Sequence, residues 1–151
     1  MKPIQFFFLL IVLAGAGCEN PQPEERKIIL LDKNDPQLVY AKKQASETLD
    51  SFISSFSSLK GDSSYFFSVK KEFGDDNERS EHMWVEVFDV NEEGFIGLLG
   101  NEPGIINTFK FGDTVRVKKD EVEDWMIYDQ AKDTILGAFT VRVLGRNDLL
   151  D

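Results

Sequence analysis

Residues 35–61, DPQLVYAKKQASETLDSFISSFSSLKG, carry apolar side chains at three- and four-residue spacing along their whole length. Asp35 can cap a helix, Pro36 fits its first turn, and Gly61 lies just past the last apolar residue. The apolar stripe comprises Leu38, Ala41, Ala45, Leu49, Phe52, Ile53, Phe56 and Leu59. This pattern predicts one long amphipathic helix whose apolar side packs against the strands that follow.

From Ser64 onward the apolar period changes to two residues, the pattern of a strand with one buried face. That face comprises Tyr65, Phe67, Val69 and Phe73, with Lys71 among them. We expect further strands at residues 81–90, 95–99, 114–118 and 124–129. Residues 137–144 (GAFTVRVL) fit a strand or a short helix, and their Val and Thr content favours a strand.

The strand at residues 81–90 (EHMWVEVFDV) is apolar on both faces. Met83, Val85 and Val87 share one face, and Trp84 and Phe88 share the other. This pattern predicts a central strand that is covered on both sides. The sequence therefore predicts an α+β domain: one long N-terminal helix packed on a curled antiparallel β-sheet.

The N-terminus resembles a secretory signal. Lys2 precedes about ten apolar residues, 4–13, and a small-residue stretch leads to Cys18, the only cysteine of the chain. The apolar run is too short to span a bilayer, so we expect a signal peptide over residues 1–17. A cysteine at this junction predicts a lipidated Cys18, as in a bacterial lipoprotein. Ordinary cleavage after Ala16 is the alternative.

Residues 18–27 are polar and contain two prolines, which predicts a tether between the lipid and a single domain at residues 28–151. Residues 27–32 (KIILLD) predict a first strand. We expect the protein in the bacterial cell envelope, held at the membrane by its N-terminal lipid. Glu19 favours the outer membrane, because it is not the usual inner-membrane retention residue. A periplasmic or secreted soluble protein is the alternative.

The chain is acidic, with 27 acidic against 17 basic residues and a formal net charge of −10. Because phosphate binding needs a basic patch, this balance argues against nucleic acid as a partner. The acid excess fits a well-solvated surface better than a specific cationic partner. A single cysteine excludes an intrachain disulfide and a cysteine-based zinc site.

His82 is the only histidine of the chain and the main candidate for chemistry. It shares a strand face with Glu86, and either Glu86 or Asp124 from another strand could make an acid–base couple with it. This is the basis of an alternative function, a small hydrolase or lyase. A zinc site would need mostly carboxylates, and residues 75–78 lack the calcium-loop spacing. We therefore expect no metal and no cofactor.

Aromatic residues in the strands suggest binding rather than catalysis. Trp84 and Trp125 could line an aromatic patch, or they could be two core anchors. The expected function is a non-catalytic binding module that contacts an envelope protein or a small ligand. A structural envelope protein without a discrete site is a further alternative. The candidate binding residues are His82, Trp84, Asn101, Pro103, Asp124 and Trp125.

Short motifs follow one another in a fixed order over roughly residues 28–146. They are Asp35-Pro36 before an alanine-bearing helix, Phe67-Ser68-Val69-Lys70, Glu81-His82-Met83-Trp84-Val85, Phe95-Ile96-Gly97, Asn101-Glu102-Pro103, Gly112-Asp113-Thr114-Val115, Asp124-Trp125-Met126 and Gly137-Ala138-Phe139-Thr140. In this order the motifs resemble the YegJ-like bacterial family, domain of unknown function 2314. The resemblance implies one compact α+β domain with no established activity and no known cofactor. Some domains related to this family resemble toxin-immunity proteins, and this resemblance implies an immunity-like role in which the domain binds a protein partner.

Overall fold

The computed structural model describes residues 34–147, and the predicted signal, tether, Cys18 and strand at 27–32 lie outside this range. The elements in chain order are α1 (Pro36–Glu47), α2 (Leu49–Leu59), β1 (Tyr65–Gly74), β2 (Ser80–Val90), β3 (Gly94–Leu99), β4 (Thr114–Lys118), the 3-10 turn η1 (Lys119–Glu121), β5 (Asp124–Asp129), β6 (Thr134–Gly137) and α3 (Phe139–Asn147).

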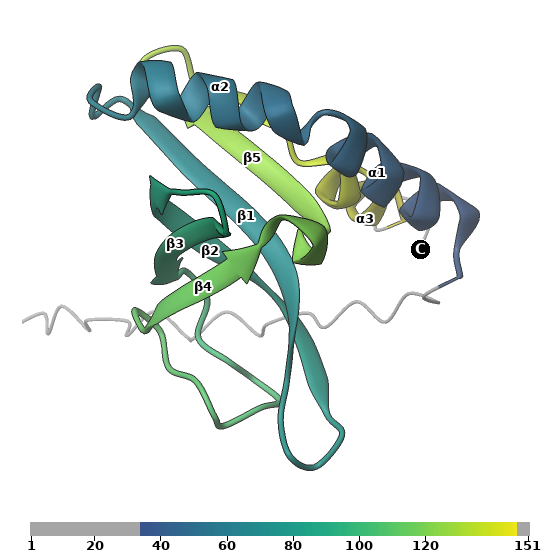
Figure 1. Ribbon diagram of the computed structural model, residues 1–151. Helices are drawn as coiled ribbons and strands as arrows, with labels where there is room; N and C mark the ends of the chain where they lie inside the picture. The colour runs from purple at the N-terminus through teal and green to yellow at the C-terminus, as the bar shows by residue number, and fades with distance from the viewer. Residues whose placement is uncertain (1–33, 148–151) are drawn as a thin grey trace, which may run out of the picture.

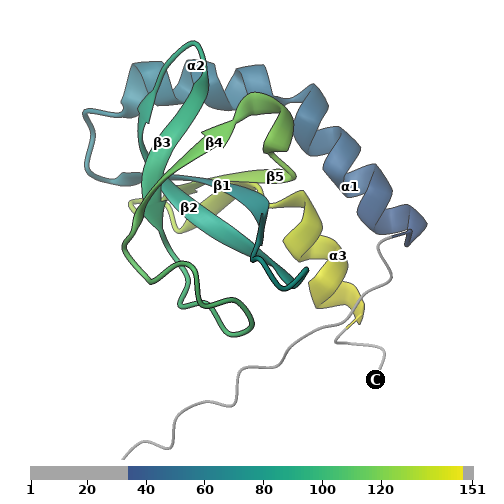
Figure 2. The ribbon, with the colours of Figure 1, turned by 60° about the horizontal axis from the view of Figure 1, so that its bottom comes forward.

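All six strands form one antiparallel sheet in the order β4-β3-β2-β1-β5-β6. Helices α1 and α2 cross one face of this twisted sheet, and α3 packs beside α1 (Figures 1 and 2). The α+β class and the antiparallel sheet are therefore confirmed. The sheet is open, with β4 and β6 as its edge strands. No helix among residues 34–147 combines the length and the apolar character needed to cross a bilayer.

The prediction of one long N-terminal helix is wrong, because the helix is interrupted at Thr48. Thr48 has φ −108° and ψ 6°, and its Oγ1 donates to the Gln44 carbonyl oxygen at 2.7 Å. The indole Nε1 of Trp125 donates to the Ala45 carbonyl oxygen and to Thr48 Oγ1, each at 3.1 Å. Side chains that insert into the helical hydrogen-bond ladder break it, whereas the apolar spacing continues unchanged through the break.

Phe52 on α2 occupies the centre of the core and is fully buried. Its ring centroid lies 5.8 Å from those of Phe67 and Phe95 and 5.7 Å from that of Trp125. One helical side chain thus contacts β1, β3 and β5. The predicted apolar face of α2 and the predicted inner face of β1 are confirmed by this packing.

The expected strand at residues 137–144 is also wrong. β6 ends at Gly137, and α3 begins at Phe139. The carboxylate of Asp124 caps this helix: it accepts hydrogen bonds from the Phe139 N–H at 3.1 Å and from the Thr140 N–H at 2.8 Å. Because the capping side chain comes from β5, local propensity favoured the strand over the short helix that the sequence also allowed.

Within the described residues, the sheet face opposite α1 and α2 is left uncovered except near Asp124, which lies opposite Lys70 and caps α3. Met83, Val85 and Val87 are buried on the helix side, whereas Phe88 is 55% exposed. The prediction that β2 is covered on both sides is therefore wrong. We call this second surface the open face. Its apolar side chains are Phe66, Leu98, Tyr128 and Ile135.

Candidate functional site

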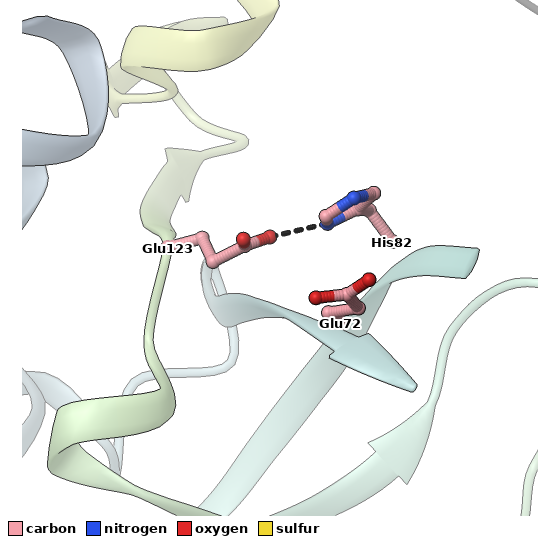
Figure 3. Close-up of side chains that lie close together, drawn as sticks. All are labelled: Glu72, His82 and Glu123. Atoms are coloured by element: carbon pink, nitrogen blue, oxygen red, sulfur yellow. Dashed lines mark hydrogen bonds and ion pairs between the residues drawn. The ribbon is translucent and has the colours of Figure 1, made fainter. Parts of the chain in front are cut away.

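Three potential donor side chains meet near the start of β2. Antiparallel pairing places His82 of β2 directly opposite Glu72 of β1. Glu123, which precedes β5, donates its N–H to the Lys70 carbonyl oxygen at 2.8 Å. The Glu123 Oε2 and the His82 Nδ1 lie 2.5 Å apart, and Glu72 lies beside the pair (Figure 3). We call these residues the Glu72–His82–Glu123 cluster.

Glu123 joins this cluster to the helical layer. Its Oε1 lies 2.6 Å from Nζ of Lys42 on α1, while its Oε2 contacts His82. Burial by itself would raise the pKa of Glu123. Hydrogen bonds from His82 and Lys42, together with their charges, outweigh burial and lower the pKa to about 2. Glu123 therefore stays a carboxylate at any ordinary pH.

We expect this depressed pKa to make stability depend on pH. A carboxyl group whose pKa falls from 4.5 to about 2 on folding stabilises the protein above pH 4.5, and the contribution disappears as the pH falls toward 2. After allowance for the partial exposure of the site, Glu123→Gln should lower the free energy of unfolding at pH 7 by about 2 kcal/mol. Urea unfolding of both proteins between pH 7 and pH 2 measures this difference.

The matched control is Glu86→Gln, which removes an exposed carboxylate from the same strand as His82 and should cost under about 0.5 kcal/mol. The gap between the wild type and Glu123→Gln should close as the pH falls through the range set by the lowered pKa. A gap of constant size at every pH would show that Glu123 stabilises the fold through packing and not through its charge.

The predicted acid–base partners of His82 need correction, because His82 pairs with Glu123 and not with Glu86 or Asp124. Asp124 is fully buried and caps α3, while Glu86 lies opposite Ser68, further along the sheet. In nucleophilic catalysis a histidine acts as the base, a carboxylate orients it, and a hydroxyl or thiol is the nucleophile. The His82–Glu123 pair corresponds to the first two of these groups. Within residues 34–147, no hydroxyl is hydrogen-bonded to His82, so the described residues show no nucleophile paired with it.

The two tryptophans lie on different sides of the sheet and do not form a shared patch. Trp125 is 6% exposed and belongs to the core, where its indole reaches the break between α1 and α2. Trp84 is partly exposed, on the other side, and Nζ of Lys70 lies 5.8 Å from its ring centroid. Trp125 is thus a structural anchor, while Trp84 stays available for contact.

The loop that contains Asn101 and Pro103 is held against β2. The Asn101 Oδ1 accepts a hydrogen bond from the Trp84 N–H at 2.8 Å. The Glu81 carboxylate accepts hydrogen bonds from the N–H groups of Gly104 and Ile105, each at 3.0 Å. The structure therefore places His82 and Trp84 on one face of β2 and holds Asn101 against the Trp84 backbone, with Pro103 in the same loop. Asp124 and Trp125 have internal roles instead.

Glu123 is the residue that sequence reasoning missed. It lies next to the candidate Asp124, but the sequence placed it in a turn before the strand. Its contact with His82 depends on the pairing of β1 with both β2 and β5, which brings positions 41 residues apart together. The sequence did contain one indication of this contact, namely an acidic residue directly before a strand in a chain with a single histidine.

Comparison with known proteins gives a consistent result. A family model described as an uncharacterized protein conserved in bacteria (DUF2314) matches residues 35–149. The chain is 33% identical over 142 residues to the uncharacterized protein YegJ of Escherichia coli (strain K12), a match that covers 93% of this chain and 86% of YegJ.

A more limited similarity links the chain to a putative ankyrin repeat protein of Neisseria meningitidis serogroup B. The two are 34% identical over 84 residues, which covers 52% of this chain and 32% of that protein. No solved structure gives a significant match. The family model spans nearly all described elements, and YegJ aligns along most of its own length. The chain therefore belongs to the YegJ-like DUF2314 family of bacterial proteins.

Proposed function

We propose that the domain is a non-catalytic binding module that presents its open face to a protein partner in the bacterial cell envelope. The observation that carries the proposal is a row of apolar side chains on this face. Phe66, Tyr128 and Ile135 lie in register across β1, β5 and β6, and the rings of Phe66 and Tyr128 stack with centroids 6.1 Å apart. Grouped apolar side chains left in water are typical of interaction surfaces.

The extent of this surface favours a protein over a small molecule. Its members extend from Leu98 on β3 to Ile135 on β6, and four steps of about 4.8 Å between strands give a width of roughly 19 Å. Small-molecule sites are usually concave and enclose most of their ligand. Trp84, Lys70 and His82 lie on the same side of the sheet and would supply the polar contacts at its margin.

We further propose that Cys18 carries a lipid and that the tether at residues 18–27 holds the domain at the membrane. The support is the position of the only cysteine directly after a short apolar run and small residues. In fractionated cells, a Cys18→Ser variant should move from the membrane to the soluble fraction. A protein cleaved after Ala16 would be soluble with or without this change.

A comparative capture experiment tests the proposed surface. The full chain is crosslinked in bacterial envelopes, solubilised in detergent and recovered, as wild type and as Phe66→Ser, which changes a 40% exposed phenylalanine of the open face on β1. The control, Phe111→Ser, changes a phenylalanine that is 64% exposed in the loop before β4 and is not part of the open face. Loss of one side chain from the middle of an interface costs about 2 kcal/mol, enough to reduce recovery of the partner about tenfold or more.

The expected result is one protein recovered with the wild type and with Phe111→Ser but depleted with Phe66→Ser. Circular dichroism checks that both variants keep the secondary structure of the wild type. Equal recovery of the same proteins with all three chains, or recovery of none, would contradict the proposed role of the open face.

A further inference from the structure

The Glu72–His82–Glu123 cluster has donor atoms in an arrangement that a metal ion can use. One ligand atom from each residue lies within 4.8 Å of the other two. In a tetrahedral zinc site, bonds of about 2.0–2.2 Å put the ligand atoms about 3.4 Å apart. The widest separation would shrink by up to about 1.4 Å, and the 2.5 Å His82–Glu123 separation would widen by about 0.9 Å. Side-chain rotation allows both changes, since Glu72 and His82 are exposed on the sheet.

The three donors come from segments whose backbone positions are set by the sheet. Glu72 and His82 are a direct cross-strand pair of β1 and β2. Glu123 is fixed by its backbone hydrogen bond to Lys70 and by the ion pair with Lys42. Because Lys42 contacts Oε1, Glu123 directs Oε2 toward His82. Preorganised ligands lose little conformational entropy when an ion binds.

We propose that Glu72, His82 and Glu123 bind a divalent first-row transition metal ion, with Zn²⁺ as the best fit. One imidazole nitrogen and two carboxylate oxygens suit zinc, whereas calcium and magnesium prefer oxygen ligands alone. The ion would replace the direct hydrogen bond between His82 and Glu123. Three protein ligands would leave a fourth position for water or for a group from another molecule.

Charge at the cluster is compatible with a cation. The two carboxylates of Glu72 and Glu123 face one imidazole, and Lys42 neutralises part of this charge. A divalent cation at the cluster would therefore meet carboxylates that are only partly compensated.

The other acidic segment of the described chain, around Asp75, is a weaker candidate. Asp75 already accepts hydrogen bonds from the N–H groups of Asn77 and Arg79, and its Oδ2 is paired with the Arg79 guanidinium. A metal ion would have to displace these local contacts. The sequence argued against zinc because the ligands would be mostly carboxylates, yet the fold assembles such a set around the only histidine.

Isothermal titration of the full chain in detergent with ZnCl₂, after treatment with EDTA and dialysis, tests the proposal. We expect one site with a dissociation constant in the micromolar range, about −8 kcal/mol. His82→Gln and Glu72→Gln should each weaken binding about tenfold or more, since each removes a ligand. Glu86→Gln, which removes an exposed carboxylate outside the cluster on the same strand, should bind zinc like the wild type.

Several outcomes would overturn the proposal. No heat of binding from the wild type up to about 100 µM Zn²⁺ would exclude a site of useful affinity. Equal weakening in Glu86→Gln and His82→Gln would indicate diffuse attraction to an acidic surface. Calcium binding as tight as zinc binding would show that the imidazole is not a ligand. Circular dichroism of each variant separates loss of a ligand from loss of the fold, and zinc binding is measured without any protein partner.

Discussion

Replacing Phe52 with alanine is expected to lower the free energy of unfolding by about 3–5 kcal/mol. Phe52 is fully buried, and its ring contacts the rings of Phe67, Phe95 and Trp125 on separate strands. Truncation would remove these contacts together and leave a cavity that rigid strands cannot fill. Urea unfolding at pH 7, followed by circular dichroism and tryptophan fluorescence, measures the loss.

Phe111→Ala is the matched control, because it makes the same substitution at an exposed position. It should change the free energy of unfolding by less than about 0.5 kcal/mol. A cost below about 1 kcal/mol for Phe52→Ala would mean that α2 does not close the core as the structure describes, since a buried phenylalanine cannot be removed so cheaply.

Asp124→Ala is expected to destabilise the protein by about 3 kcal/mol, because several buried donors lose one acceptor at the same time. The Asp124 carboxylate accepts hydrogen bonds from the N–H groups of Trp125, Phe139 and Thr140, and from Thr140 Oγ1 at 2.6 Å. Thr140 is itself buried, so water cannot readily replace the lost acceptor. Urea unfolding gives the total cost, and amide hydrogen exchange reports where protection is lost.

Protection should fall most in α3, since this helix depends on Asp124 for its N-terminal cap. Thr140→Val removes only the hydroxyl bond and should cost about 1 kcal/mol. If Asp124→Ala costs no more than Thr140→Val and leaves α3 protected, the carboxylate is not the cap that holds this helix.

Local periodicity was sufficient for most of the fold. The stripe through Phe52 predicted the helical layer, and the two-residue period through Phe67 and Val69 predicted the inner face of β1. Both signals arise because each element buries one side against the same core. The motif order also led to the correct family. These features depend only on residues close together in the sequence.

The two errors about helices share a physical cause, because each involves a contact between residues far apart in the sequence. The break at Thr48 depends on Trp125, and the start of α3 depends on Asp124. The apolar residues on both sides of β2 suggested double coverage, although nothing in the described chain packs on Phe88 as a second layer. Apolar content alone does not distinguish a covered face from one kept exposed.

The candidate site was predicted in part. His82 and Trp84 were correctly assigned to one face of β2, because alternation along a strand is reliable. The partner of His82 was not predictable, since Glu123 reaches it only through the registers of two strand pairs. Trp125 was grouped with Trp84 by residue type, whereas the sheet separates the two residues.

Photocrosslinking from the two sides of the domain tests most directly whether the open face binds a protein partner. A photoreactive phenylalanine analogue is placed at Phe66 on the open face or at Tyr40 on α1, which is 61% exposed. The full chain is irradiated in bacterial envelopes, and adducts are detected by their increased mass. If the open face binds a partner, we expect a discrete adduct from position 66 and none from position 40. An adduct from position 40 alone would contradict this role of the open face and would place the partner on the helical layer.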